Sequence, residues 1–436
     1  MSSDWHEVAL EEVIGTVNTG LDAIKRAPIV ERTTGIKCLR IQDISQSKNF
    51  YDWGNTEVKE QDFEKYRLKK NEIIMARTCS PGICLLVKSD LNAVFNNGLA
   101  RIRANEELVD PRFLLYVFKS KEFSDYIYGI SHGTSVQLNM KVGDLTKYRL
   151  FLPPLNVQHD ISGLLEILDD RITLLRETNA TLEAIAQALF KSWFVDFDPV
   201  RTKMEGRAPE GMDEATAALF PDSFEESDLG LVPKGWLVKR LDEISEVGIG
   251  KTPPRKEPEW FSDGSEAVRW VSIRDMGVSG VYIADTAEGL VPEAIDRFNV
   301  RRVPDNTVLL SFKLTVGRVS ITDGEMTTNE AIAHCKLRQE DPLPTEFIYL
   351  YLKQFDFGSL GSTSSIAEAV NSKTIKLIPI IAPSNEVVSA FHSLVSGIFQ
   401  RLKENERQAK TLTALRDTLL PRLISGQLRL SELTVD

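Results

Sequence analysis

The stretch LPPLNVQHDISGLLEILDDRITLLRETNATLEAIAQALFKSWF, residues 152–194, decides the architecture of this chain. After Pro154 its apolar residues alternate at steps of four and three, which is the heptad pattern of a coiled coil. They are Ile161, Leu165, Leu168, Ile172, Leu175, Leu182, Ala186, Leu189 and Trp193, with Asn179 inside the series. At a rise of 1.5 Å per residue, a helix from Asn156 to Phe194 is about 58 Å long. The pattern therefore predicts one long helix in the middle of the chain.

A second stretch, after Pro383, has the same alternation and also contains one asparagine, Asn405. Its seam is formed by Phe391, Val395, Ile398, Leu402, Ala409, Leu412, Arg416, Leu419 and Leu423. Pro421 lacks an amide donor and is expected to end or kink this helix near Leu420.

The two asparagines predict how the helices pair. If Ile161 faces Leu423 in an antiparallel pair, Asn179 faces Asn405, because each asparagine lies 18 residues from its end of the seam. Parallel pairing leaves both amides without a partner, at a cost of about 1–3 kcal/mol each when they are buried. A buried asparagine fixes the register of a coiled coil at some cost in stability. We therefore predict an intramolecular antiparallel coiled coil with Asn179 and Asn405 in register; the alternative is that both amides lie in water at the edge of the seam.

The sequence contains an internal repeat, with one copy ahead of each helix and an offset of 229–235 residues between the copies. Matched stretches are LEEV (10–13) with LDEI (241–244), LRIQDI (39–44) with VSIRDM (271–276), NEIIMAR (71–77) with NTVLLSF (306–312), and FLLYVFK (113–119) with FIYLYLK (347–353). Each copy has short β-branched runs separated by Gly and Pro and one amphipathic helix, which predicts mixed α and β structure. Strands are expected at 37–44, 72–77 and 83–87, and again at 269–274, 307–312 and 319–322.

These features predict a mixed α/β (α+β) fold with two similar globular domains, related by an approximate twofold axis across the antiparallel coiled coil. The predicted segments are a first globular domain (1–153), the central helix (154–195), an acidic linker (196–232), a second globular domain (233–382), and a distal helix with the C-terminal tail (383–436). The linker has ten acidic and three basic residues and so carries −7 of the net charge of −11. Its Pro, Gly and acidic content predicts little core of its own.

Composition excludes several classes of protein. No apolar run approaches the roughly 18 residues of a membrane span, and MSSDWHEVAL lacks the features of a signal peptide, so a cytoplasmic location is expected. The four cysteines have no C-x-x-C spacing and the five histidines are scattered, so we expect no metal site.

The sequence resembles the specificity subunit of Type I restriction-modification systems. The resemblance covers essentially the whole chain and rests on LPPLNVQHDI (152–161), ALFKSWFVDFDPVRTKMEGR (188–207), ALFPDSFEESDLGLVPKGW (218–236) and LLPRLISGQLRL (419–430). It implies that each globular domain is a target recognition domain that reads one half of a bipartite double-stranded DNA site, and that the helices set the spacer and dock other subunits.

The resemblance also implies where catalysis resides. Two modification subunits methylate adenine with S-adenosylmethionine, and restriction subunits can join for cleavage that uses ATP and Mg²⁺. An adenine methyltransferase needs a [DNS]-P-P-[YF] motif for the flipped base, and this chain has none. We therefore expect no catalytic residue and no cofactor in the chain. The competing hypothesis is a non-catalytic structural adaptor whose two domains bind proteins instead of DNA.

Candidate DNA-binding residues combine a suitable residue type with a matched place in the repeat, since phosphates need cations and base edges need Arg, Asn, Gln, Ser or Thr. Two glycine-hydroxyl loops, HGTSVQLN (132–139) and GSTSSIAEAVN (361–371), contain Thr134, Ser135, Thr363 and Ser364. These four residues are equally consistent with ordinary helix N-caps.

Further candidates lie on predicted strands. Arg40 and Gln42 match Ser272 and Arg274, and strand alternation would put each pair on one face. Arg77 and Lys313 stand at strand exits that were matched between the copies. For each of these the alternative is a solvated surface residue.

Two further features need an interpretation. EVGIGKTPP, residues 246–254, contains the G-K-T of a phosphate-binding loop, but Ser245 stands where that motif needs glycine and two prolines follow Thr252. Its match with GTVNTGLDA, residues 15–23, instead predicts a glycine-marked turn in which Lys251 contacts DNA phosphate or water.

Trp193 and Phe194 are proposed to dock a modification subunit; the alternative is packing against the second globular domain.

Overall fold

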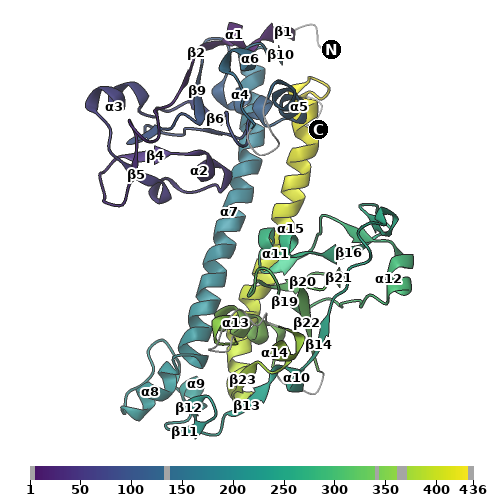
Figure 1. Cartoon of the computed structure of the whole chain (residues 1–436). Helices are drawn as coiled ribbons and strands as arrows, with labels where there is room; N and C mark the ends of the chain where they lie inside the picture. Colours follow the sequence, from purple (N-terminus) through teal and green to yellow (C-terminus); the bar gives the residue numbers. More distant parts are fainter. Residues whose placement is uncertain (1–4, 132–137, 339–342, 361–370, 431–436) are drawn as a thin grey trace. The chain divides into compact units, whose positions relative to one another are not determined.

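The computed structural model describes the whole chain except residues 1–4, 132–137, 339–342, 361–370 and 431–436 (Figure 1). Contacts divide the chain into two compact units. Unit 1 comprises residues 1–172 and 411–436, and unit 2 comprises residues 173–410. Each unit contains one copy of the repeat and a portion of each of two 40-residue helices, α7 (Leu155–Phe194) and α15 (Asn385–Ile424). Both predicted long helices are thus confirmed.

Unit 1 is built on two four-stranded sheets, ordered β2-β9-β6-β7 and β3-β5-β4-β8, with a short β1-β10 ladder. Its elements before α7 are β1 (His6–Ala9), α1 (Leu10–Val13), β2 (Ile14–Thr19), β3 (Ile29–Val30), β4 (Lys37–Leu39), α2 (Ile41–Ser45), η1 (Phe50–Asp52), β5 (Gly54–Thr56), α3 (Glu60–Tyr66), β6 (Glu72–Ala76), β7 (Cys84–Leu86), β8 (Ala93–Phe95), β9 (Leu99–Ala104), α4 (Pro111–Phe118), α5 (Lys121–Ile130), α6 (Val142–Leu145) and β10 (Arg149–Leu152).

Unit 2 has a five-stranded sheet, β14-β22-β19-β20-β17, a four-stranded sheet, β15-β18-β16-β21, and the pairs β13-β23 and β11-β12. Between α7 and α15 lie α8 (Asp198–Met204), α9 (Glu214–Ala218), β11 (Phe224–Ser227), β12 (Gly230–Pro233), β13 (Leu237–Arg240), α10 (Leu241–Ile244), β14 (Ser245–Ile249), η2 (Pro258–Trp260), β15 (Phe261–Ser262), β16 (Val268–Val271), α11 (Ile273–Val278), β17 (Tyr282–Ile283), β18 (Gly289–Leu290), α12 (Pro292–Phe298), β19 (Val308–Ser311), β20 (Val319–Thr322), β21 (Thr327–Thr328), β22 (Ile332–Leu337), α13 (Thr345–Gln354), η3 (Phe357–Leu360), α14 (Ser372–Lys376) and β23 (Pro379–Ala382).

The strand orders confirm the mixed α/β fold and the internal repeat. β2-β9-β6-β7 in unit 1 corresponds to β14-β22-β19-β20 in unit 2, which adds β17 at one edge. Backbone details repeat as well. The residue that precedes β6 by one position, Asn71, has a φ of 69°, and Asn306, two positions before β19, has a φ of 57°. Asparagine tolerates this left-handed conformation better than most residues do.

One part of the strand prediction was wrong. β4 ends at Leu39 and is followed by α2, and β16 ends at Val271 and is followed by α11. The buried carboxylates of Asp43 and Asp275 explain both helices, because each accepts a backbone N–H from the residue that precedes its helix, at 2.9 and 2.8 Å. Helices of five and six residues are too short to show helical periodicity in the sequence.

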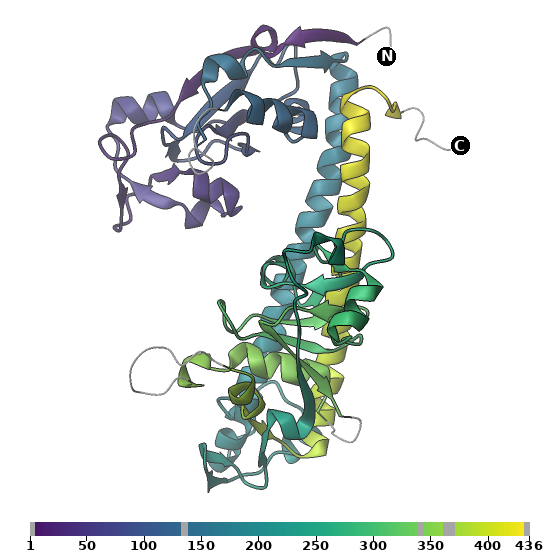
Figure 2. The same cartoon turned by 45° about the vertical axis from the view of Figure 1, so that its right-hand side comes forward.

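Each unit closes its core with both long helices. In unit 1, Ile161 and Leu165 of α7 and Leu420 and Leu423 of α15 belong to the same buried cluster as the amphipathic helix α4. In unit 2 the main cluster combines the last turns of α7 and the first half of α15 with α13 and the large sheet. Within each unit the portions of α7 and α15 lie side by side (Figures 1 and 2).

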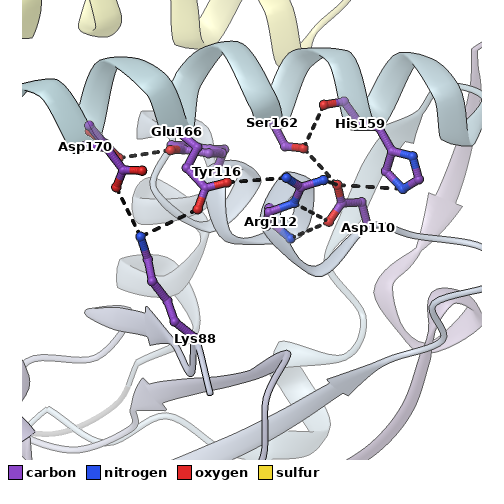
Figure 3. A network of polar contacts seen from close by, with 9 residues as sticks. Lys88, Asp110, Arg112, Tyr116, His159, Ser162, Glu166 and Asp170 are labelled. Carbon is purple, nitrogen blue, oxygen red and sulfur yellow. Dashed lines mark hydrogen bonds and ion pairs between the residues drawn. The ribbon is translucent and has the colours of Figure 1, made fainter.

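In unit 1 a polar network fixes α7 to the globular domain (Figure 3). Asp110, the N-cap of α4, is 4% exposed and accepts a hydrogen bond from Ser162 at 2.8 Å. Arg112 bridges Asp110 and Glu166, with N···O distances of 2.9 and 3.3 Å. Burial opposes ionisation of Asp110, but the bonds from Arg112 and Ser162 outweigh it and lower the pKa of this carboxyl group. Lys88 adds ion pairs to Glu166 and Asp170.

The asparagine pair is present in unit 2. Asn405, which is 2% exposed, donates from Nδ2 to Oδ1 of Asn179 at 2.8 Å, and Asn179 donates to the carbonyl oxygen of Leu402 at 3.0 Å. In unit 1, Arg416 of α15 pairs with Asp169 of α7 at 2.7 Å. The predicted antiparallel pairing is therefore observed, and the alternative of two hydrated amides is not.

Two other expectations differ from the structure. α15 continues through Pro421 to Ile424, and the carbonyl oxygen of Pro421 still accepts the N–H of Ser425 at 3.2 Å, so the proline does not end the helix. Residues 196–232 are folded and contribute Phe197, Val200 and Phe220 to the main core of unit 2. This segment has no core of its own, as expected, but its aromatic residues make it part of the unit.

Among the described residues no helix is long and apolar enough to cross a membrane.

Removing one asparagine should cost more than removing both. Asn179→Leu leaves the buried amide of Asn405 without its acceptor, so we expect a loss of about 1–3 kcal/mol in the free energy of unfolding. The double replacement Asn179→Leu, Asn405→Leu substitutes an apolar pair and should recover most of this loss. Chemical unfolding of the single and double variants measures the coupling, and additive effects of the two changes would contradict it.

Candidate nucleic-acid interface

Lys251 follows a glycine that the fold requires. A β carbon on Gly250 would lie 2.2 Å from the carbonyl oxygen of Thr328, and one on Gly20 would lie 2.3 Å from that of Phe95. Both glycines allow the chain to cross close to a neighbouring strand. Packing therefore explains the glycine in both copies, and in the first copy no lysine follows it. Lys251 itself is exposed.

The structure also shifts the predicted match by one residue. Gly250 is equivalent to Gly20, because their N–H groups make equivalent bonds to β22 and β9, each at 3.2 Å. The sequence match had placed Lys251 opposite Gly20. The difference arises from a register shift in β2 between Ile14 and Thr16, which adds one residue in the first copy.

Arg40 and Gln42 do not share a strand face, which corrects that prediction. Arg40 is the N-cap of α2 and its guanidinium lies 3.3 Å from the buried carboxylate of Asp43. Ser272 is the equivalent N-cap of α11 and its hydroxyl donates to Asp275 at 2.6 Å. The residues at these two matched positions are therefore engaged at the starts of their helices.

The following turn of each short helix is different. Gln42 on α2 and Arg274 on α11 are both exposed. Among the contacts of the described residues, no side-chain hydrogen bond or ion pair of either residue is present. The same scaffold thus presents an amide in unit 1 and a guanidinium in unit 2, and both groups can bind base edges.

Arg77 stands at the exit of β6, and the structure confirms its sequence match with Phe312. The N–H of Arg77 donates to the carbonyl of Gly98, and the N–H of Phe312 donates to that of Ala331, both at 3.0 Å. Arg77 is therefore equivalent to Phe312, and Lys313 is equivalent to the residue that follows Arg77. Lys313 is exposed, with its ammonium 5.6 Å from the ring of Phe312.

In unit 1 the start of the β6–β7 turn contacts the connection between β8 and β9 and the end of the HGTSVQLN loop. Arg77 donates to the carbonyl oxygen of Asn97 and to Oδ1 of Asn139, both at 3.2 Å. The N–H of Cys79 donates to the carbonyl oxygen of Leu138 at 3.0 Å. Arg77 thus holds the end of the HGTSVQLN loop, so part of its guanidinium is already engaged.

In unit 2 the β19–β20 turn is the equivalent of the β6–β7 turn of unit 1. Arg318, just beyond the turn, donates from Nη1 to the carbonyl oxygen of Ile273 at 2.5 Å and so ties the turn to α11. A β carbon on Gly317 would lie 3.1 Å from the ring of Phe357 in η3. The turn, the start of α11 and η3 therefore adjoin one another. Arg318 was not identified as a candidate from the sequence. The one signal in the sequence was its position directly after Gly317, the glycine shared by both copies.

Thr134, Ser135, Thr363 and Ser364 lie outside the described residues. Their loops border the two turns at their described ends, Leu138 and Asn139 in unit 1 and η3 in unit 2.

Several other basic residues are buried or neutral. Arg101 on β9 is 3% exposed and its guanidinium lies 3.5 Å from the carboxylate of Glu72. His334 on β22 is buried, and desolvation together with the nearby Arg301 lowers its pKa to about 4, so it is neutral at physiological pH. Neither residue offers a free cation to a ligand.

Two polar clefts lie elsewhere. One in unit 1 is lined by Lys70, Asn71, Glu106, Asp110, Pro111, Arg112 and His159. One in unit 2 is rich in carboxylates, which are paired with bases: Glu288 with Arg255 and Glu325 with Arg302. Within the described part of the chain, no group of His, Cys, Asp and Glu is placed to hold a metal ion.

Trp193 and Phe194 do not form a docking surface. They are 5% and 2% exposed, and Phe194 packs against the rings of Phe391, Phe347 and Trp236 at centroid distances of 4.9, 5.0 and 5.9 Å. The assignment of these residues to partner docking is thus corrected in favour of the alternative, packing against the second globular domain. Burial of large aromatic surfaces explains why this helix end is so rich in aromatic residues.

Phe194→Ala should therefore act on stability. The loss of a buried ring typically costs about 3–5 kcal/mol in the free energy of unfolding. We expect a clearly lower unfolding temperature, while Val195→Ala, at a position 44% exposed, changes it little. Calorimetry of the two variants makes the comparison. Unchanged stability of Phe194→Ala together with loss of a co-purifying methyltransferase would instead restore the docking role.

Comparisons with known proteins agree with this geometry. The family model described as Type I restriction modification DNA specificity domain matches residues 2–184 and 233–419, once for each copy of the repeat. The chain is 30% identical to the Type I restriction enzyme HindI specificity subunit of Haemophilus influenzae, over 98% of this chain and 100% of that one. It is 26% identical to the MjaIX specificity subunit of Methanocaldococcus jannaschii, over 84% and 79%.

A solved structure shares the fold. The Type I restriction-modification S subunit from M. genitalium aligns with a TM-score of 0.57 at 16% identity, over 96% of both chains. With two copies of the domain matched and a relative covered over its full length, this chain belongs to the Type I restriction-modification DNA specificity family.

Proposed function

We propose that this chain is the DNA-recognition subunit of a Type I restriction-modification complex, in which each unit reads one half of a bipartite, asymmetric site. The observation that carries the proposal is the repeat itself. One backbone arrangement occurs twice and presents different groups at matched positions: exposed Gln42 against exposed Arg274, and half-buried Thr78 against exposed Lys313. Two copies of a reader with different side chains suit a site whose halves differ in sequence.

The proposal includes partners. Two modification subunits supply adenine methylation with S-adenosylmethionine, and restriction subunits supply cleavage with ATP and Mg²⁺. Three features support a non-catalytic role for this chain: the specificity subunits among its relatives, the lack of a [DNS]-P-P-[YF] motif, and exposed candidate groups that are cations and amides. We further propose that α7 and α15 set the spacer between the half-sites and carry docking surfaces for the modification subunits.

Mapping of methylated adenines tests the function directly. The chain is expressed with its modification subunits in cells that lack other adenine methylation, and the methylated sequences are read genome-wide. We expect one bipartite motif with a fixed spacer. Uniform methylation, or none, with a correctly assembled complex would favour the structural adaptor.

Single substitutions should relax one half-site each. Arg274→Ala should lose discrimination at one position of the half-site read by unit 2, worth about 1–3 kcal/mol, and leave the other half-site intact. Gln42→Ala is the matched control and should do the converse. Motif mapping and equilibrium binding with single-base variants of the site measure both effects. Equal weakening on all sequences would instead identify Arg274 as a phosphate contact.

A further inference from the structure

The β6–β7 and β19–β20 turns have one backbone conformation and different residues at their tips. Cys79 and Leu314 each have a φ of 62°, and Gly82 and Gly317 have φ values of 95° and 91°. Their backbone hydrogen bonds also match. The N–H of Gly82 donates to the carbonyl of Ala76 at 3.0 Å, and that of Gly317 donates to Ser311 at 2.9 Å.

Leu314, at the tip in unit 2, is 97% exposed. It combines two costs: a large apolar side chain lies in water, and a residue with a β carbon adopts the left-handed backbone region. Strained, exposed residues of this kind occur at ligand contacts.

The tip is held firmly. The buried hydroxyl of Ser311 donates to the carbonyl oxygen of Thr315 at 2.5 Å and accepts the N–H of Arg318 at 3.0 Å. Arg318 then anchors the turn to α11 through the carbonyl oxygen of Ile273. The turn that carries Leu314 is therefore fixed to α11, the helix that carries Arg274.

The turn and the helix that anchors it each carry an exposed cation. Lys313 precedes Leu314 and is exposed, and Arg274 is exposed on the adjoining helix. A ligand that fits this surface has negative charge next to a small apolar group. The major groove of DNA has this combination where a phosphate neighbours a thymine, whose 5-methyl group is the apolar mark on the base edge.

We propose that Leu314 makes an apolar contact with the 5-methyl group of a thymine in the half-site read by unit 2, while Lys313 contacts a nearby phosphate. This inference rests on the proposed function. Cys79 holds the same position in unit 1, so the two units read different bases with one turn geometry.

The test replaces each thymine of the mapped half-site by deoxyuridine, which lacks only the 5-methyl group. The full chain in complex with its modification subunits is used, and binding is measured at fixed salt. For the unaltered chain we expect one such replacement to weaken binding about fourfold, the effect of one methyl group removed from water. Leu314→Ala should bind thymine DNA at least fourfold more weakly and should no longer distinguish thymine from deoxyuridine at that position.

Leu237→Ala is the matched control, since Leu237 is also exposed, at 62%, but lies on β13. It should keep the full thymine preference, and unfolding temperatures should be equal for all three proteins. The inference is overturned if Leu314→Ala retains the deoxyuridine effect at every thymine, or if the half-site contains no thymine to which binding responds. Failure of the unaltered complex to bind any specific sequence would instead refute the proposed function.

Discussion

Each globular domain completes its core on two helix portions that come from distant parts of the chain. In unit 1 the buried cluster that holds α4 includes Ile161 and Leu165 from α7, and Leu420 and Leu423 from α15. More than 250 residues separate these two contributions in sequence. Because one buried cluster contains side chains from both helices, the core of the first domain is complete only when the C-terminal end of the chain is in place. Unit 2 has the same dependence on Phe190 and Phe391.

The two units meet this constraint with different chemistry. Unit 1 uses polar groups, with the buried Asp110 and Ser162 and the half-buried Arg112 bonded across α4 and α7. Unit 2 packs Phe190 and Phe194 against α13 and α15. Directional hydrogen bonds fix the placement of α4 on α7, whereas the aromatic cluster supplies more apolar burial.

The candidate interface consists of positions at which the two copies share a backbone but differ in side chain. Gly20 and Gly250, Asp43 and Asp275, and Gly82 and Gly317 are retained in both copies because the backbone needs them for close approach, capping or positive φ. Gln42 and Arg274, or Cys79 and Leu314, differ because nothing inside the unit constrains them. Residues that the fold leaves free are the ones available for binding DNA.

The sequence by itself determined the repeat, the two long helices and their antiparallel register. Heptad spacing and the positions of Asn179 and Asn405 can be read directly from the order of residues. It could not determine which aromatic or basic residues are exposed. Trp193 and Phe194 look like a surface in sequence, yet they are buried by rings from α13 and α15. Arg40 looks like a base reader, yet Asp43 engages it. The short helices α2 and α11 and the exposed Leu314 were equally invisible, because a five-residue helix has no period and exposure depends on partners far away in the chain.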